Sequence, residues 1–252
     1  MPLQPTTARQ RRQEKTMLVL RFLRTTIYSS ADILGRVMGL TDRAGIYKTL
    51  KGIEQQHLIQ CRRFADFGGI TLWGITGHGQ DKARFDGEEE DQRTFNPSKI
   101  SARTLFHYLD IQRAHIQREQ IGWTSFEYLD HSQRKKPFSM NHKQEESQYS
   151  AKADLLATTP EGIRAAIEVE ITLKAECRYR DSIIPGHVRK LNAKEYQFVL
   201  WVCRSQEQQQ NLTEILKRVV EKLRADNKWY LDVPKTNYKL FQFAHLANWP
   251  NF

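Results

Sequence analysis

In the first third of the chain, apolar residues recur every three or four positions and then begin to alternate with polar ones. Residues 15–26 and 41–59 have the spacing of two amphipathic helices, the second capped by Thr41. Residues 29–40 predict a shorter helix, because two serines stand where a helix cap is favoured. Residues 58–79 form two runs of β-type residues around the turn sequence ADFGG. The pattern therefore predicts three helices followed by a β-hairpin.

The middle of the chain returns to helical spacing and then changes to β-type runs. A helix is expected over residues 101–120, and a short second helix over residues 123–137, capped by one of its first polar residues. Residues 147–158 and 162–174 are both of β type and flank the turn sequence TTPEG. These two runs predict a second β-hairpin.

The last part of the chain predicts further helices and strands. Within residues 182–195 a helix is expected after Pro185, and the continuous apolar run at 196–203 is typical of a buried central strand. Residues 211–226 have the pattern of an amphipathic helix, and residues 228–233 and 238–243 predict late edge strands. Together with the second hairpin, these elements predict a mixed sheet with helices on its faces, in the α+β or α/β class.

The composition fits a folded protein that binds a polyanion. The chain has 252 residues, 39% hydrophobic and 27% charged, enough for one large or two ordinary domains. Its net charge of +10 favours nucleic acid as a partner. No apolar run approaches the roughly 18–20 residues of a transmembrane helix, and the polar, basic start does not resemble a secretion signal. Three widely spaced cysteines predict no disulfide framework, so we expect a cytoplasmic protein.

Charge is distributed unevenly along the chain. Residues 1–84 carry 14 Lys and Arg against 6 Asp and Glu, a net charge of 14 − 6 = +8. Residues 85–93 carry five acidic residues and one Arg. A short acidic run that contains a glycine is typical of a linker. We therefore expect one domain at 1–84 and another at 98–252, joined by an acidic linker at 85–97.

The first expected domain resembles a winged helix-turn-helix, both in the order of its elements and in the sequence LWGITGHG at its second wing strand. In that family the third helix enters the major groove of DNA and the wing lies along the backbone. The resemblance implies that side chains of the third helix read DNA and that arginines of the wing contact phosphates. A small protein-binding domain is the alternative. The residues expected at the DNA are Arg43, Tyr47, Lys48 and Lys51 on the helix, and Arg62 and Arg63 on the wing.

Carboxylates are concentrated on the second predicted hairpin, although acidic residues are unusual in strands. Asp154 lies on its first strand, and Glu168 and Glu170 share one face of its second strand because side chains alternate. Lys174 follows directly. Grouped carboxylate oxygens suit a hard divalent cation such as Mg²⁺ or Mn²⁺, and such a cation can activate water for attack on phosphorus. The hairpin is therefore a candidate site for metal-dependent cleavage of a phosphodiester; a solvated sheet face is the alternative.

The acids and the order of elements resemble the PD-(D/E)XK nuclease superfamily, which has the restriction-endonuclease-like fold. By this resemblance, Asp154 corresponds to the family's Asp and Glu168 to its second acid. Glu170 stands where the family usually has a lysine, a departure found in a minority of members, and Lys174 would replace that lysine. Glu127 matches an acid that the family often carries on its first helix.

A longer pattern, made of WTSFE, AD, EVEITLK, RY and YQFVLW behind a winged helix, resembles the replication-relaxation family. Within it, the chain is most similar to the MOBC class of plasmid mobilisation relaxases. This resemblance implies metal-dependent nicking of one strand of duplex plasmid DNA at an origin of transfer, inside a bacterium. It also implies an accessory mobilisation or coupling protein as a partner. Arg178, Tyr179 and, on a weaker match, His107 would lie near the DNA.

Two other functions fit the same residues. One is a non-catalytic winged-helix regulator of plasmid replication or transcription, in which the nuclease-like domain serves for dimerisation. The other is a site-specific endonuclease that cuts both strands. The sequence contains no glycine-rich phosphate loop of the GxxxxGK[ST] type, so nucleotide hydrolysis is not indicated.

Overall fold

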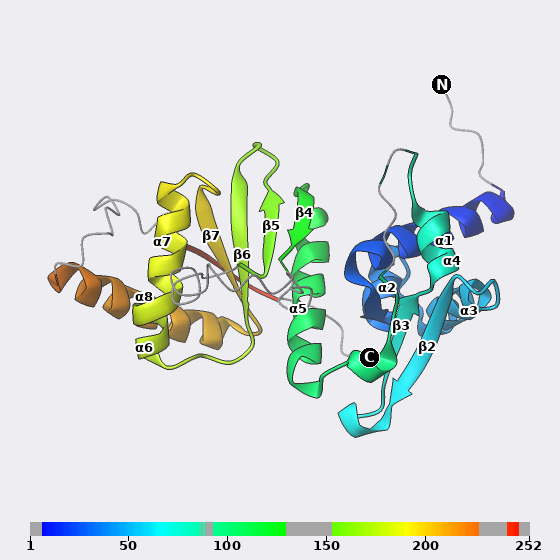
Figure 1. Ribbon diagram of the computed structural model, residues 1–252, viewed down its shortest axis with the longest axis horizontal. Coiled ribbons are helices and arrows are strands. Elements are labelled where there is room, and N and C mark those ends of the chain that lie inside the picture. Colours follow the sequence, from blue (N-terminus) through cyan, green and yellow to red (C-terminus); the bar gives the residue numbers. More distant parts are fainter. Residues whose placement is uncertain (1–6, 87, 89–92, 130–152, 227–240, 247–252) are drawn as a thin grey trace, which may run out of the picture. The chain divides into compact units, whose positions relative to one another are not determined.

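The computed structural model describes residues 7–86, 88, 93–129, 153–226 and 241–246. They form α-helices and two β-sheets, an α+β architecture (Figure 1). The chain folds into two compact units that divide after Gln112, inside helix α5 (Ala102–Glu119). No helix in the described ranges is both long enough and apolar enough to span a membrane.

The first unit consists of helices packed with a small antiparallel sheet. Its strands follow the order β1-β3-β2, and each outer strand pairs with β3 along its length. The expected order of three helices and a hairpin is confirmed, with β1 as an additional short strand. Before α5, the elements are α1 (Ala8–Thr26), β1 (Tyr28–Ser30), α2 (Ala31–Val37), α3 (Arg43–Glu54), β2 (Ile59–Phe64), β3 (Ile70–Ile75) and α4 (Gly77–Ala83).

Helix caps and apolar spacing account for the helices of this unit. Thr7 and Gln10 form a reciprocal capping box at the start of α1. Asp42 caps α3, because its carboxylate accepts hydrogen bonds from the backbone nitrogens of Ala44 and Gly45. The expectation that Thr41 is the cap was wrong by one residue. The apolar faces of α1 and α3 pack together with Trp73 of β3 in a common core.

The expected linker, residues 85–97, lies within the first of the two units. Phe95 holds the last part of this expected linker against the unit, because its backbone nitrogen donates to the carbonyl oxygen of Ile75 at 3.0 Å. The Phe95 ring also occupies the space beside Gly74, where any larger side chain would collide with it. The part of the expected linker around Phe95 is therefore anchored to strand β3.

The second unit is built on a five-stranded mixed sheet with the order β4-β5-β6-β7-β8. Strands β4, β5 and β6 are antiparallel neighbours, whereas β6, β7 and β8 run parallel. After α5, the elements are β4 (Thr124–Tyr128), β5 (Leu155–Thr158), β6 (Arg164–Glu170), α6 (Glu176–Arg178), α7 (Ile184–Asn192), β7 (Phe198–Cys203), α8 (Gln206–Ala225) and β8 (Phe241–His245).

Several expectations for this unit can be compared with the structure. The described part of the expected hairpin is confirmed as β5 and β6; residues 147–152 lie outside the described residues, and the second strand ends at Glu170 instead of Lys174. The apolar run at 196–203 contains the fully buried central strand β7. The short helix expected at 123–137 was wrong where that range is described, because Thr124–Tyr128 form strand β4 and pair with β5. Of the two late strands, 228–233 lies outside the described residues, and the end of 238–243 belongs to β8.

One face of the sheet is covered by the helices that follow β6. Trp201 and Cys203 of β7 pack there with Val188 of α7 and Leu212 of α8. The alternation of side chains along a strand places Glu168 and Glu170 on this same face, because they pair in register with Trp201 and Cys203. The acidic residues of β6 therefore point into a largely apolar core rather than into bulk solvent.

Candidate functional site

Asp154 is held beside strand β6 by two backbone contacts. Its backbone nitrogen donates to the carbonyl oxygen of Ile167 at 3.1 Å. Its carboxylate Oδ2 accepts a hydrogen bond from the backbone nitrogen of Val169 at 2.8 Å, and the residue is buried. Val169 lies between Glu168 and Glu170 in the sequence. The hairpin thus fixes the Asp154 carboxylate next to the acidic part of β6, as the sequence pattern predicts.

Glu170 is the most deeply buried acid of the hairpin, with 2% of its side chain exposed. Its Oε1 forms an ion pair with Nζ of Lys174. Its Oε2 accepts a hydrogen bond from the hydroxyl group of Tyr179 at 2.5 Å, and this hydroxyl also accepts from the backbone nitrogen of Lys174 at 3.1 Å. Burial raises the pKa of Tyr179 to about 12, so the phenol keeps its proton. Both carboxylate oxygens of Glu170 are therefore engaged within the protein.

Lys174 lies within electrostatic reach of all three acids. Burial lowers the pKa of its ammonium group, while attraction to the charges of Glu168 and Asp154 raises that pKa. The nearby Arg178 contributes a smaller repulsion in the same direction as burial. Lys174 is bonded directly to Glu170, and the other two acids act on it through space. Asp154, Glu168 and Lys174 thus belong to one cluster.

Glu168 faces a buried histidine that the sequence did not single out. Its Oε1 lies 3.0 Å from Nε2 of His187, and 13% of the Glu168 side chain is exposed. Burial lowers the pKa of His187 to about 3, so the imidazole is neutral near pH 7. Nδ1 of His187 lies 2.7 Å from the hydroxyl oxygen of Tyr196, whose pKa burial raises. The protonated hydroxyl donates to Nδ1, which leaves the hydrogen of the neutral ring on Nε2. Nε2 is close to Glu168, but among the described residues it has no well-aligned hydrogen-bond acceptor.

The resemblance implies a bound divalent cation, and the acidic side chains of the cluster can be compared with the ligands that such a cation needs. In the described ranges, no group of three or more His, Cys, Asp or Glu side chains is arranged to hold a metal ion. Mg²⁺, however, is often held by one or two carboxylates, with water and phosphate oxygens completing its shell. Asp154 and Glu168 fit this smaller donor set. Glu170 would first have to release Lys174 and Tyr179.

Three further residues expected at the site lie on other elements. Glu127 was expected on a helix, but it lies on strand β4, where its carboxylate pairs with Arg164 of β6 at 3.0 Å. The reason is that β4 pairs with β5 as the edge of the sheet. Arg178 is exposed on α6, which directly precedes Tyr179. His107 is partly buried on α5, in the first unit.

The residues of helix α3 that were expected at the DNA divide into two groups. Arg43 and Lys48 are exposed. Tyr47 instead packs edge-on against Trp73, with ring centroids 6.2 Å apart. Nζ of Lys51 bonds to Oε2 of Glu54 at 2.7 Å and lies 5.3 Å from the centre of the Trp73 ring. Tyr47 and Lys51 are thus partly committed to contacts within the unit.

The hairpin that follows α3 carries two more basic side chains. Arg62 and Arg63 are both exposed on β2, and they pair in register with Leu72 and Thr71 of β3. Neighbouring residues of a strand point to opposite faces of the sheet. The two guanidinium groups therefore extend from opposite faces of the same hairpin, and each is accessible to a ligand.

Comparison of this chain with models of protein families, with curated proteins and with solved structures finds no match.

Proposed function

We propose that the protein is a metal-dependent endonuclease that nicks one strand of duplex plasmid DNA at an origin of transfer, as a mobilisation relaxase does. The observation that carries this proposal is the cluster of Asp154, Glu168 and Lys174 on and beside the β5–β6 hairpin. Burying two acids and a lysine against an apolar core costs free energy. Clusters of charged groups that are kept in spite of this cost are found preferentially at functional sites.

The arrangement of the second unit supports this proposal. A helix, an acid-bearing hairpin, a second helix and a buried strand are the core of the PD-(D/E)XK superfamily. The hairpin, the second helix and the buried strand correspond to β5–β6, α7 and β7, with β7 parallel to β6. The first helix was expected at residues 123–137, whose described part is strand β4; the helix that precedes the hairpin is α5. The family's first acid and second acid correspond to Asp154 and Glu168, whereas the third acid of the hairpin, Glu170, forms an ion pair with Lys174.

In the proposed reaction, each side chain has a separate task. Asp154 and Glu168 would hold Mg²⁺ or Mn²⁺, and the bound cation would supply Lewis acidity and a water of lowered pKa. His187 lies against Glu168 and would limit the positions that this carboxylate can take, because the neutral imidazole is itself fixed by the hydroxyl group of Tyr196. Lys174 adds a positive charge that favours the approach of a phosphate and stabilises negative charge that develops on it.

The first unit would supply DNA recognition. Its order of three helices and an antiparallel hairpin is that of a winged helix, in which α3 would enter the major groove and β2 would lie along the backbone. Arg43 and Lys48 are available to read DNA from α3. Arg62 and Arg63 are available to contact phosphates from β2. An accessory mobilisation or coupling protein remains an expected partner.

One observation favours a second function, a winged-helix regulator without nuclease activity. Glu170 is neutralised by Lys174 and hydrogen-bonded to Tyr179, so this part of the acidic face is closed by internal contacts. In a regulator, the sheet of the second unit would serve only for structure or dimerisation. Such a protein would bind its DNA site equally well with or without a divalent cation and would leave the DNA intact.

A plasmid-nicking assay separates the two functions. Purified protein is incubated with the supercoiled plasmid in Mg²⁺, Mn²⁺ or EDTA, beside the variants Asp154→Asn and Glu168→Gln. The matched control is Glu214→Gln, which removes an exposed carboxylate from helix α8 of the same unit. We expect open circles that require the cation, are lost in both site variants and persist in the control. Intact plasmid in every lane, with DNA binding retained and cell extract added, would favour the regulator.

A further inference from the structure

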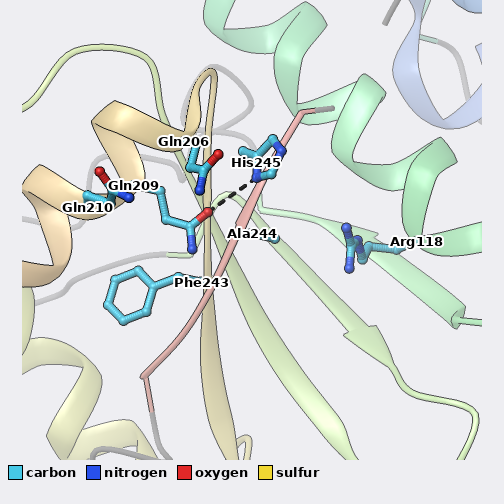
Figure 2. A pocket seen from close by; sticks show the side chains of 7 residues that line it. All are labelled: Arg118, Gln206, Gln209, Gln210, Phe243, Ala244 and His245. Atoms are coloured by element: carbon cyan, nitrogen blue, oxygen red, sulfur yellow. Dashed lines mark hydrogen bonds between the residues drawn. The ribbon is translucent and has the colours of Figure 1, made fainter. Parts of the chain in front are cut away.

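The second unit contains a pocket of about 480 Å³ between the first turns of α8, the end of β8 and the last turn of α5 (Figure 2). Its volume lies within the range of small-molecule sites, roughly 300–1,000 Å³. We call it the Arg118 pocket. The residues that line it are Arg118, Gln206, Gln209, Gln210, Phe243, Ala244 and His245.

The pocket lies next to the acidic cluster along the sheet. His245 pairs in register with Cys203, which pairs in register with Glu170. Two strand spacings separate His245 from Glu170, a distance of roughly 10 Å. Gln208, the neighbour of Gln209, donates from its side-chain amide to the carbonyl oxygen of Glu170 at 3.0 Å. The pocket and the cluster therefore share the carboxyl end of the parallel strands, where open α/β sheets commonly bind ligands.

Arg118 brings a positive charge to this pocket, and its guanidinium carbon lies 6.0 Å from the centre of the Trp123 ring. Among the described residues its buried Nε has no hydrogen-bond partner, and none of the seven lining residues is acidic. Burial lowers the pKa of the guanidinium group, which shows that the charge is partly withdrawn from water. A partly buried guanidinium without a carboxylate is unfavourable, and a phosphate is the anion whose geometry it matches best. The pocket is therefore suited to an anionic ligand.

The other lining residues match a nucleobase. Nδ1 of His245 lies 3.3 Å from Oε1 of Gln209, which fixes that amide and leaves its NH₂ group for a ligand (Figure 2). Gln206 and Gln210 add two more amides that can donate and accept hydrogen bonds. Phe243 offers an aromatic face, on which any base can stack. A guanidinium, several amides and one aromatic ring together are typical of proteins that bind unpaired nucleotides.

We propose that the Arg118 pocket binds one nucleotide of a single DNA strand, with the phosphate on Arg118 and the base between Phe243 and the glutamine amides. This deepens the proposed function and rests on it, because the nucleotide would lie in the strand that passes the acidic cluster. A paired, stacked base presents neither its face nor its Watson–Crick edge to a protein. The pocket thus selects a strand that has been separated from its partner beside the cut.

The test measures binding without cleavage. A fluorescent single-stranded oligonucleotide of about ten nucleotides, within the range of known single-strand sites, is titrated with the full chain in EDTA. A duplex of the same sequence reports binding by the first unit. The variants are Arg118→Gln and Phe243→Leu, and the matched control is Arg164→Gln. Arg164 lies at the other end of β6, roughly 20 Å along the strand from Glu170. Far-UV circular dichroism checks that each variant is folded.

We expect Arg118→Gln to weaken binding of the single strand about 10- to 100-fold, the effect of one lost charged hydrogen-bond pair. The salt dependence of log K should also fall by about 0.7, as for one lost phosphate contact. Phe243→Leu should weaken it by about tenfold through lost stacking. Arg164→Gln should leave single-strand binding unchanged, and all three variants should bind the duplex like the wild type.

Two results would overturn the proposal. One is equal single-strand affinity for the wild type, Arg118→Gln and Phe243→Leu. The other is competition by inorganic phosphate or a mononucleotide as strong as that by the oligonucleotide, which would identify a site for small anions instead. Neither result depends on nicking. If the pocket variants lose single-strand binding but the wild type never nicks plasmid, the proposal for the Arg118 pocket stands and the nuclease proposal is rejected.

Discussion

Replacing Glu170 with glutamine removes the charge that compensates Lys174 inside the second unit. Loss of one partner from a buried ion pair costs about 3–5 kcal/mol of unfolding free energy. Since 29% of the Lys174 side chain is exposed, water offsets part of this loss, and we expect about 2–3 kcal/mol. Glu168→Gln, two residues away, should cost about 1 kcal/mol, because the neutral His187 does not neutralise its charge.

A double variant separates the charge effect from other effects of the Glu170 substitution. In Glu170→Gln/Lys174→Met, neither charge remains, so most of the stability lost in Glu170→Gln should return. Because the chain has two units, a single unfolding transition cannot be assumed. We would therefore combine urea unfolding with native-state hydrogen exchange of the peptide that covers β6. Unchanged exchange in Glu170→Gln, or no recovery in the double variant, would refute the assignment of Glu170 to a structural ion pair.

Three further predictions concern pH, DNA and packing. The folded pKa of His187, about 3 against 6.5 in the unfolded chain, gives a contribution to stability that is complete above pH 6.5. It is lost as pH falls toward 3, by up to about 1.4 kcal/mol per unit; His187→Gln should flatten this slope in urea midpoints measured from pH 7 to 5. Arg62→Gln with Arg63→Gln should weaken duplex binding for all sequences alike and lower the salt slope by about 1.8, in titrations at several salt concentrations. Gly79→Ala would press a methyl group onto the carbonyl oxygen of Leu58 and cost about 3 kcal/mol, which calorimetry of the first unit would detect.

The acid-bearing hairpin could be predicted from sequence because its signals are local. Two β-type runs flank a turn, and alternation along one strand fixes which acids share a face. Asp154 and Glu168 thus lie near each other, as expected. The helices of the first unit were equally predictable, because Ile46, Leu50 and Ile53 repeat at helical spacing and are buried together.

Other features depend on contacts between distant residues. Strand β4 was mistaken for a helix because Thr124 and Ser125 resemble a helix cap, whereas its pairing with β5 decides its conformation. The hydrogen bond from Tyr179 to Glu170 requires the turn after β6 to bring the phenol back to the strand. The neutral state of His187 follows from burial, which the sequence around it does not indicate.

The central claim is that Asp154 and Glu168 serve to cut one strand of DNA at one place. The most direct test maps the nick by primer extension on both strands of the plasmid, after incubation with the wild type or Glu168→Gln in Mg²⁺. We expect a single stop on one strand with the wild type and none with the variant. Stops on both strands, or a stop that persists in Glu168→Gln, would contradict the account.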